Sequence, residues 1–241
     1  MLERTKSAKP LYLQIKDIVK QKIINNEYMV GTTIPSENEL EEMFGVSRMT
    51  IRQAISELVN EGLLRKERGR GKGTVVLSNA IADRLTTIKS FTQKMHEQGF
   101  VLKNKDIDCT LAPAGENVAN VFELHPEEEV FCLKRTRMVN KDIIMYSISY
   151  VPPFLKLPTE PSLYDSLYKQ FSQKQINIKH AEEFIEATLA DDDISKKLEV
   201  SPGAAVLKRT RTSKDAVGRY VEYTETYYRS DKYKYVVELT L

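Results

Sequence analysis

The chain has 241 residues, enough for one large domain or two modest ones. Its formal net charge is only +2, so any binding of nucleic acid has to depend on where the charges lie. Cys109 and Cys132 fit neither a disulfide framework nor a metal site, and no segment resembles a signal peptide or a membrane span of about 20 apolar residues. We therefore expect a soluble cytoplasmic protein without a metal or other cofactor.

Two helices are predicted near the start of the chain. The first begins after Pro10, which suits a helix start, and ends near residues 25–26. Its apolar residues recur at helical spacing: Leu11, Tyr12, Ile15, Ile18, Val19 and Ile23. Ser36 begins the second helix, because Glu39 three residues on completes a capping-box pattern. Gly45 ends this helix, since glycine adopts the positive φ that a tight turn requires.

A third helix is predicted between Ser47 and Gly62, and the short glycine-containing turn before it indicates a helix-turn-helix. One face is apolar, with Ile51, Ala54, Ile55, Leu58 and Val59. The other face is polar, which a solvated helix would also show. However, Arg, Thr and Gln gather in the first two turns, where a recognition helix reaches base edges and phosphates. The candidate DNA contacts are Ser47, Arg48, Thr50, Arg52 and Gln53.

A basic hairpin is predicted after this helix. Residues 63–64 and 74–77 form two short strands around a tip of Gly, Arg and Lys. Between Gly45 and Val75 there are seven Arg or Lys against three Glu. A solvated turn is the alternative, but beside a helix-turn-helix such a tip can contact phosphates or enter a minor groove. Arg68, Arg70 and Lys72 are therefore further candidates for DNA contact.

The run IPSENELEEMFGVSRMTIRQAISELVNEGLL, followed by GKGTVV, resembles the winged helix-turn-helix of GntR-type bacterial transcriptional regulators. The resemblance implies a DNA-binding domain over residues 1–77 and adds Ser36, Asn38 and Gly73 to the candidate contacts. Two features depart from the family pattern. Asn38 stands where the family usually has an arginine that touches DNA, and the wing is slightly longer. Both bear on the operator sequence.

Residues 78–87 have no strong periodicity and are expected to be a linker. Residues 88–241 then mix strands and helices, and their short turns predict an antiparallel sheet with packed helices, an α+β domain. The expected strands are 106–112, 130–139, 143–151, 181–189, 204–212, 219–228 and 233–241. The expected helices are 88–99, 116–124, 162–171 and 193–200.

Arg135 and Arg137 alternate on one expected strand, so both project from the same sheet face, where they can capture a phosphate or carboxylate. Glu222 and Tyr228 share a face of a later strand and suit sugar hydroxyls. Ser162 precedes an expected helix whose start can hold an anion. A solvated sheet face and a simple capping serine are the alternatives.

The segments SFTQKM, LKRTR, SLYDSL and VEYTETYYRSDKYKYV resemble the UTRA effector-binding domain of the HutC subfamily of GntR regulators. This resemblance implies a phosphate site at Arg135, Arg137, Ser162 and Tyr164, and sugar contacts from Glu222 and Tyr228. Ser147 departs from the pattern, because relatives often have an acidic residue there. A hexose or hexosamine phosphate is the effector that the resemblance predicts.

The sequence as a whole predicts a homodimeric, ligand-controlled regulator, most simply a repressor, that binds a double-stranded DNA operator. The alternative is an enzyme, since the UTRA fold is similar to that of chorismate lyase. No catalytic residue is predicted, because the three histidines lie in unrelated contexts and GRGKGT lacks the spacing of a phosphate-binding loop. Nonspecific architectural DNA binding would leave the large second domain unexplained.

Overall fold

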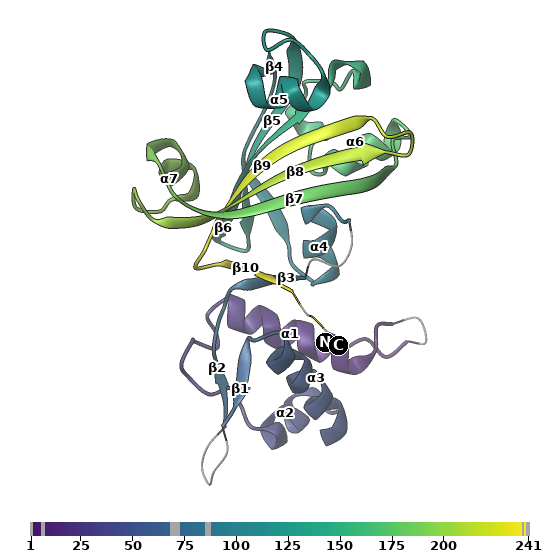
Figure 1. Cartoon of the computed structure of the whole chain (residues 1–241). Coiled ribbons are helices and arrows are strands. Elements are labelled where there is room, and N and C mark those ends of the chain that lie inside the picture. The colour runs from purple at the N-terminus through teal and green to yellow at the C-terminus, as the bar shows by residue number, and fades with distance from the viewer. Residues whose placement is uncertain (1, 6–7, 68–72, 85–87, 238, 240–241) are drawn as a thin grey trace. The chain divides into compact units, whose positions relative to one another are not determined.

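The computed structural model describes residues 2–5, 8–67, 73–84, 88–237 and 239 (Figure 1). The chain folds as two compact units, residues 1–84 with 234–241, and residues 85–233. This division differs from the expected one at two places. The expected linker contains strand β3 (Ile81–Arg84), and β3 pairs with β10 (Tyr233–Val236) in a two-stranded sheet. Residues 234–236 of β10 therefore belong with the first unit rather than with the second.

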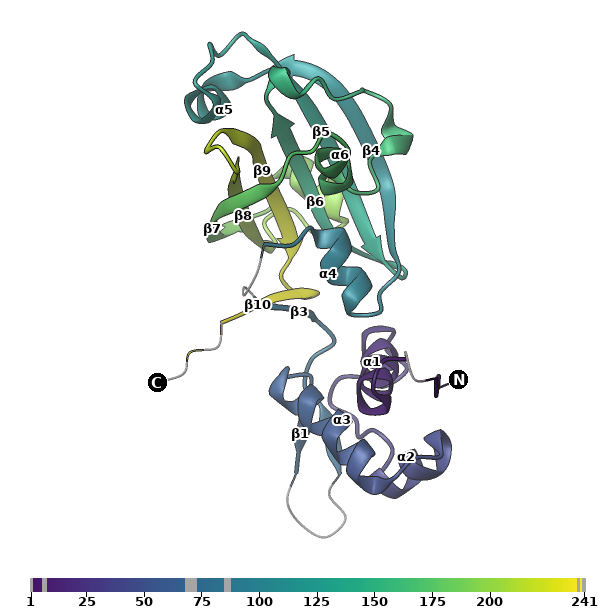
Figure 2. The same cartoon turned by 90° about the vertical axis from the view of Figure 1, so that its right-hand side faces the viewer.

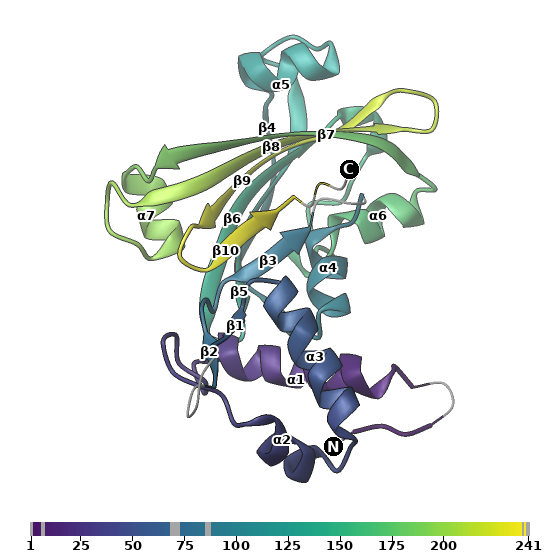
Figure 3. The same ribbon diagram turned by 60° about the horizontal axis from the view of Figure 1, so that its bottom comes forward.

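The first unit contains the expected helix-turn-helix and hairpin. Its helices are α1 (Leu11–Ile24), α2 (Glu37–Phe44) and α3 (Arg48–Asn60), and its hairpin pairs β1 (Leu64–Lys66) with β2 (Thr74–Val76). Figure 3 shows α2 beside the start of α3, and α1 packed across α3. The predicted apolar stripes meet in one core, which includes Ile15, Val19, Ile23, Ile51, Ala54, Ile55 and Leu58. Hydrophobic periodicity therefore placed these helices correctly.

The second unit is built on one antiparallel sheet of six strands, in the order β4-β5-β6-β9-β8-β7. The strands are β4 (Leu102–Pro113), β5 (Glu129–Val139), β6 (Asp142–Val151), β7 (Ile178–Leu189), β8 (Ala205–Asp215) and β9 (Tyr220–Arg229). The hairpins β5–β6 and β8–β9 form as predicted, and β6 pairs with β9 to join them. The α+β class expected for this part of the chain is confirmed.

Helices cover both faces of this sheet. On one face α6 (Leu167–Gln173) packs Leu167 and Phe171 against Phe131 and Leu133 of β5. Figure 2 shows α4 (Phe91–Glu97) on the same face as α6. The opposite face carries α5 (Gly115–Phe122), which packs on Val130 and Tyr223, and α7 (Asp192–Leu198), which packs on Ile143 and Tyr146. Two short 3-10 turns, Pro153–Leu155 and Pro161–Leu163, precede α6.

Two predicted elements differ from those observed. The helix expected over 162–171 begins only at Leu167, since Ser166 caps it with its side chain. The strand expected over 233–241 is the short β10, and it lies outside the six-stranded sheet. Within the described ranges, no helix combines the length and apolarity needed to cross a membrane.

Candidate functional site

The turn between α2 and α3 is fixed by its caps. Ser36 accepts a hydrogen bond from the Glu39 amide, and the Glu39 carboxylate accepts one from the Ser36 amide, which completes the capping box. Gly45 ends α2 with φ of 59°, a left-handed conformation that glycine adopts at little cost. Ser47 caps α3 through the Thr50 amide. These local contacts set the direction in which the first turns of α3 project.

The polar face of α3 is open to solvent. Arg48, Arg52 and Gln53 are exposed, and Thr50 is half-buried with its hydroxyl 2.9 Å from that of Ser47. Ser36, Asn38 and Ser47 are also exposed, on or beside the two helices. The candidate DNA contacts of the helix-turn-helix are therefore all at least partly accessible to solvent.

An acidic residue that sequence reasoning missed lies within this face. Glu37, the first residue of α2, accepts hydrogen bonds from Arg48 Nε at 3.4 Å, Arg52 Nε at 3.0 Å and Lys66 Nζ at 3.0 Å. Lys66 belongs to β1, so a single carboxylate joins α2, α3 and the hairpin. The pattern PSEN held no signal for this contact, because the partners are 11 to 29 positions away in the sequence.

The hairpin tip is only partly described. Arg68, Arg70 and Lys72, which were predicted to contact DNA, lie outside the described residues. Gly73 lies at the base of the tip, where its carbonyl accepts a hydrogen bond from the Glu67 amide at 3.1 Å. A Cβ atom at this position would stand 3.3 Å from Cγ2 of Thr33, so a larger residue would crowd the hairpin.

A pocket lies on the α4 and α6 face of the six-stranded sheet. Pairing places Arg135, Ser147, Thr226 and Arg209 side by side across β5, β6, β9 and β8. The adjacent positions Ser149, Thr224 and Arg211 lie across three of the same strands. The other walls come from the start of α4 (Ser90, Phe91 and Thr92) and of α6 (Ser166, Leu167 and Tyr168). Its floor is thus lined by hydroxyl groups between two pairs of arginines.

Arg135 and Arg137 are buried in this pocket with little compensation. Arg135 donates to the Tyr164 carbonyl at 3.1 Å, and Arg137 donates to the Asp165 carbonyl at 2.6 Å and to the Thr92 hydroxyl at 3.0 Å. Neither arginine has an ion pair within the described residues, and the buried Nε atom of each lacks a hydrogen-bond partner there. Burial lowers the pKa of Arg135 to about 10. Burial, together with the neighbouring charge of Arg135, also holds the pKa of Arg137 well below its usual value. Two positive charges therefore lack an anion.

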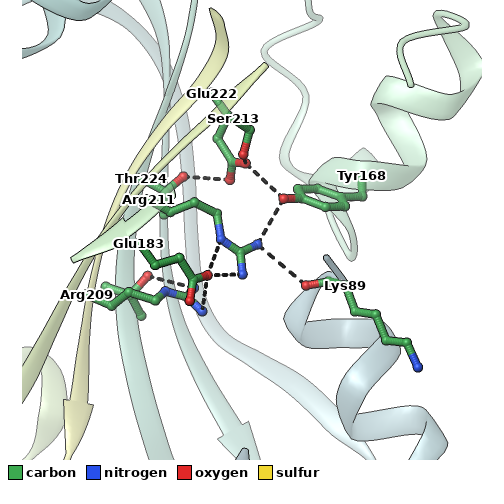
Figure 4. Close-up of polar contacts among 9 residues, drawn as sticks. Lys89, Tyr168, Glu183, Arg209, Arg211, Ser213, Glu222 and Thr224 are labelled. Atoms are coloured by element: carbon green, nitrogen blue, oxygen red, sulfur yellow. Dashed lines mark hydrogen bonds and ion pairs between the residues drawn. The ribbon is translucent and has the colours of Figure 1, made fainter. Parts of the chain in front are cut away.

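The second arginine pair is compensated. Glu183 of β7 accepts a hydrogen bond from Arg211 Nε at 2.6 Å and lies 3.5 Å from Arg209 NH1. Arg211 also donates to the Tyr168 hydroxyl at 2.9 Å and contacts the Lys89 carbonyl (Figure 4). Although burial and the charge of Arg209 act the other way, Tyr168 and the carboxylates of Glu222 and Glu183 hold the pKa of Arg211 above its usual value. An incoming anion is therefore favoured at Arg135 and Arg137 rather than here.

Of the two copies of a short repeat, the one that lines this pocket is not the one named in the sequence prediction. SLY occurs at 162–164 and again at 166–168. Ser162 is exposed and donates to Glu160, and the fully buried Tyr164 donates its hydroxyl to the Pro158 carbonyl and packs on Phe131. The side chains of the first copy lie away from the pocket, because residues 161–163 form a 3-10 turn instead of a helix start. Ser166 and Tyr168 of the second copy line the pocket.

Glu222 and Tyr228, the predicted sugar contacts, are separated in the structure. Glu222 lines the pocket and accepts hydrogen bonds from Tyr168, Ser213 and Thr224 at 2.7–3.0 Å. Tyr228 is fully buried and stacks on Tyr233, with ring centroids 4.1 Å apart. Glu222 therefore lines the pocket, whereas Tyr228 packs against Phe91 and Arg209, two residues of its wall.

A sequence signal exists for the second arginine pair. The run LKRTR, singled out at 133–137 for Arg135 and Arg137, recurs at 207–211 and places Arg209 and Arg211 on the same sheet face. Thr92 and Tyr168 gave no comparable signal, since each comes from a helix that reaches the pocket only through tertiary packing.

Comparison with known proteins decides the family. The sequence profile of the bacterial regulatory proteins of the gntR family matches residues 11–76, and that of the UTRA domain matches residues 97–234. The chain belongs to the GntR family and carries a UTRA domain. It is 32% identical over 232 residues to the HTH-type transcriptional repressor NagR of Bacillus subtilis (strain 168), covering 94% of this chain and 93% of that protein. This GntR regulator is thus a DNA-binding transcription factor and not an enzyme, as expected.

Further relatives match over nearly the whole chain. The mannosyl-D-glycerate transport/metabolism system repressor MngR of Escherichia coli (strain K12) is 26% identical over 232 residues, covering 95% of each protein. Among solved structures, PhnF from Mycobacterium smegmatis has a TM-score of 0.67 at 23% identity, covering 95% of this chain and 99% of that chain. The structural likeness confirms the fold of a GntR regulator with an effector domain.

Proposed function

We propose that this GntR regulator is a repressor whose effector is a phosphorylated sugar or amino sugar, held through its phosphate by Arg135 and Arg137. The observation that carries the proposal is the pair of buried guanidinium groups without an ion-pair partner in the described part of the chain. A phosphate monoester brings between one and two negative charges and three strong acceptor oxygens. It therefore supplies both the charge and the hydrogen-bond acceptors that this end of the pocket lacks.

The rest of the pocket suits a ligand rich in hydroxyl groups. Ser147, Ser149, Thr224 and Thr226 line the floor, and the buried Ser147 hydroxyl has no hydrogen-bond partner among the described residues. Leaving such a group unsatisfied costs about 1–3 kcal/mol, which a ligand hydroxyl can recover. The names of two relatives also refer to sugar derivatives: the mannosyl-D-glycerate repressor MngR and a probable fructoselysine utilization operon repressor, both of E. coli K12.

In the proposed mechanism the regulator acts in the cytoplasm as a homodimer, so that two recognition helices reach adjacent half-sites of the operator. Effector binding favours a dimer geometry in which the two DNA-binding units no longer fit both half-sites. The ligand shifts this equilibrium only by its differential affinity for the two geometries.

A thermal-shift panel tests the effector class. Hexose 6-phosphates and hexosamine 6-phosphates are compared with their parent sugars and with inorganic phosphate. At 100 times its Kd, a phosphate ester is expected to stabilise the chain by about 2.7 kcal/mol, or roughly 5 °C or more. The parent sugars are expected to give no shift, because they leave Arg135 and Arg137 without an anion.

Two variants make this test specific to the pocket. Arg137→Gln removes one phosphate contact and is expected to abolish the shift. Lys134→Gln removes a cation of the same strand whose exposed side chain lies on the opposite sheet face, and it is expected to leave the shift intact. Stabilisation by a sugar phosphate that survives in Arg137→Gln would contradict the proposed site.

A further inference from the structure

Glu37 is an unexpected residue in a face that meets DNA. Its carboxylate cancels one positive charge where Arg48, Arg52 and Lys66 gather. Electrostatics alone disfavours it, since DNA affinity rises with each cation that neutralises a phosphate. A carboxylate in this position therefore has to contribute something other than net charge.

The geometry of the contacts indicates what it contributes. Both arginines use Nε to reach Glu37, at 3.4 and 3.0 Å. Their side chains are 57% and 56% exposed, and in the described ranges the terminal nitrogens of neither arginine donate a hydrogen bond. The outer edge of each guanidinium, which makes bidentate contacts to guanine or phosphate, is thus left open.

Glu37 is itself held firmly. It is the first residue of α2, directly after the capping serine, and its side chain is only 20% exposed. Although burial acts the other way, its hydrogen bond to Lys66 and its contacts with the two arginines hold the pKa of Glu37 below its usual value. The carboxylate therefore stays ionised at neutral pH and acts as a fixed acceptor between α2, α3 and β1.

We propose that Glu37 is a positioning residue for operator recognition, which orients the guanidinium groups of Arg48 and Arg52 before DNA arrives and ties them to the hairpin through Lys66. The proposal rests on the DNA-binding role of this face. Immobilising a long side chain on binding costs conformational entropy, so two pre-oriented arginines raise specific affinity by roughly tenfold, or about 1.4 kcal/mol. Nonspecific binding gains nothing from this, because it requires charge rather than orientation.

The test compares specific with nonspecific binding by the full-length protein. Sites are selected from a random-sequence DNA library by the unaltered protein, and Kd is measured for the selected DNA and for random DNA of equal length. In Glu37→Gln the ratio of nonspecific to specific Kd is expected to fall about tenfold. Glu42→Gln removes the same charge from an exposed position of the same helix and is expected to leave the ratio unchanged.

The variant Glu37→Asp distinguishes the effect of where the carboxylate lies from the effect of its charge. It keeps the carboxylate but shortens its reach, so it is also expected to lower the ratio, whereas a charge effect alone predicts no change. The inference would be overturned if Glu37→Gln changed both Kd values equally. It would also be overturned if the lower Kd ratio were explained by a lower melting temperature of the variant. A wild-type protein that enriched no DNA sequence would instead contradict the proposed function itself.

Discussion

At the scale of single residues, Arg135 shows a conflict between stability and ligand binding. Its side chain is almost fully buried, and it has no ion pair among the described residues. Lowering its pKa from 12.5 to about 10 corresponds to a cost on the order of 3 kcal/mol for keeping it charged in the folded protein. The folded protein is destabilised by this amount as long as no anionic ligand is bound beside Arg135.

Replacing Arg135 by methionine is therefore expected to separate the two properties. Arg135→Met removes the buried charge and fills much of the same space, so the free energy of unfolding without ligand is expected to stay equal or rise by about 1–3 kcal/mol. The same variant is expected to lose its response to sugar phosphates. Urea unfolding with and without the ligand measures both effects. A large loss of stability without ligand would show that Arg135 is structural.

At the scale of elements, α1 is fastened to the end of α3 by an ion-pair cluster. Glu61, the C-cap of α3, contacts Lys16 at 3.0 Å and Lys20 at 2.8 Å, both from α1. The side chain of Lys20 is only 3% exposed, so the nearby Glu61 carboxylate stabilises its charge. Although burial acts the other way, Lys20 and Lys16 hold the pKa of Glu61 below its usual value.

Glu61→Gln is expected to destabilise the first unit by about 3–5 kcal/mol, because it removes the carboxylate from an ion pair with a buried ammonium. In the unaltered protein this stability is present above the unfolded-state pKa of 4.5 and is lost as the pH falls through the lower folded-state value. Hydrogen exchange of the α1 amides measures the effect. Glu57→Gln, a change one turn earlier in α3, is the matched control and is expected to exchange as the wild type does. Equal protection in both variants would contradict this account.

Elements with strong periodicity could be predicted, whereas those decided by long-range contacts could not. The stripe Ile51, Ala54, Ile55 and Leu58 identified α3 because its residues repeat at helical spacing. The start of α6 was misplaced because both SLY copies carry a capping serine, and only packing of Leu167 and Phe171 on the sheet favours the second. Likewise, β10 pairs with β3, about 150 positions earlier, and no local pattern indicates such a partner.

At the scale of the whole molecule, the two proposed sites lie in different compact units, and the sequence revealed each only in part. Strand alternation correctly placed Arg135 and Arg137 on one sheet face, which lines the pocket. Thr92, Ser166 and Tyr168 come from helices whose packing on the sheet brings them to the same pocket. Glu37 and Lys66 meet Arg48 and Arg52 in the same way. Periodicity gives the face of an element, but only tertiary packing shows which faces meet.

The most direct test of the account is fluorescence anisotropy of the full-length protein on the DNA upstream of its own gene. We expect sequence-selective binding that weakens steeply with salt, and at least a tenfold loss of affinity when the stabilising sugar phosphate is added. Arg135→Met is expected to bind the same DNA and to remain bound when the phosphate is present. DNA binding that no sugar phosphate weakens, or equal release of Arg135→Met, would contradict the central claim.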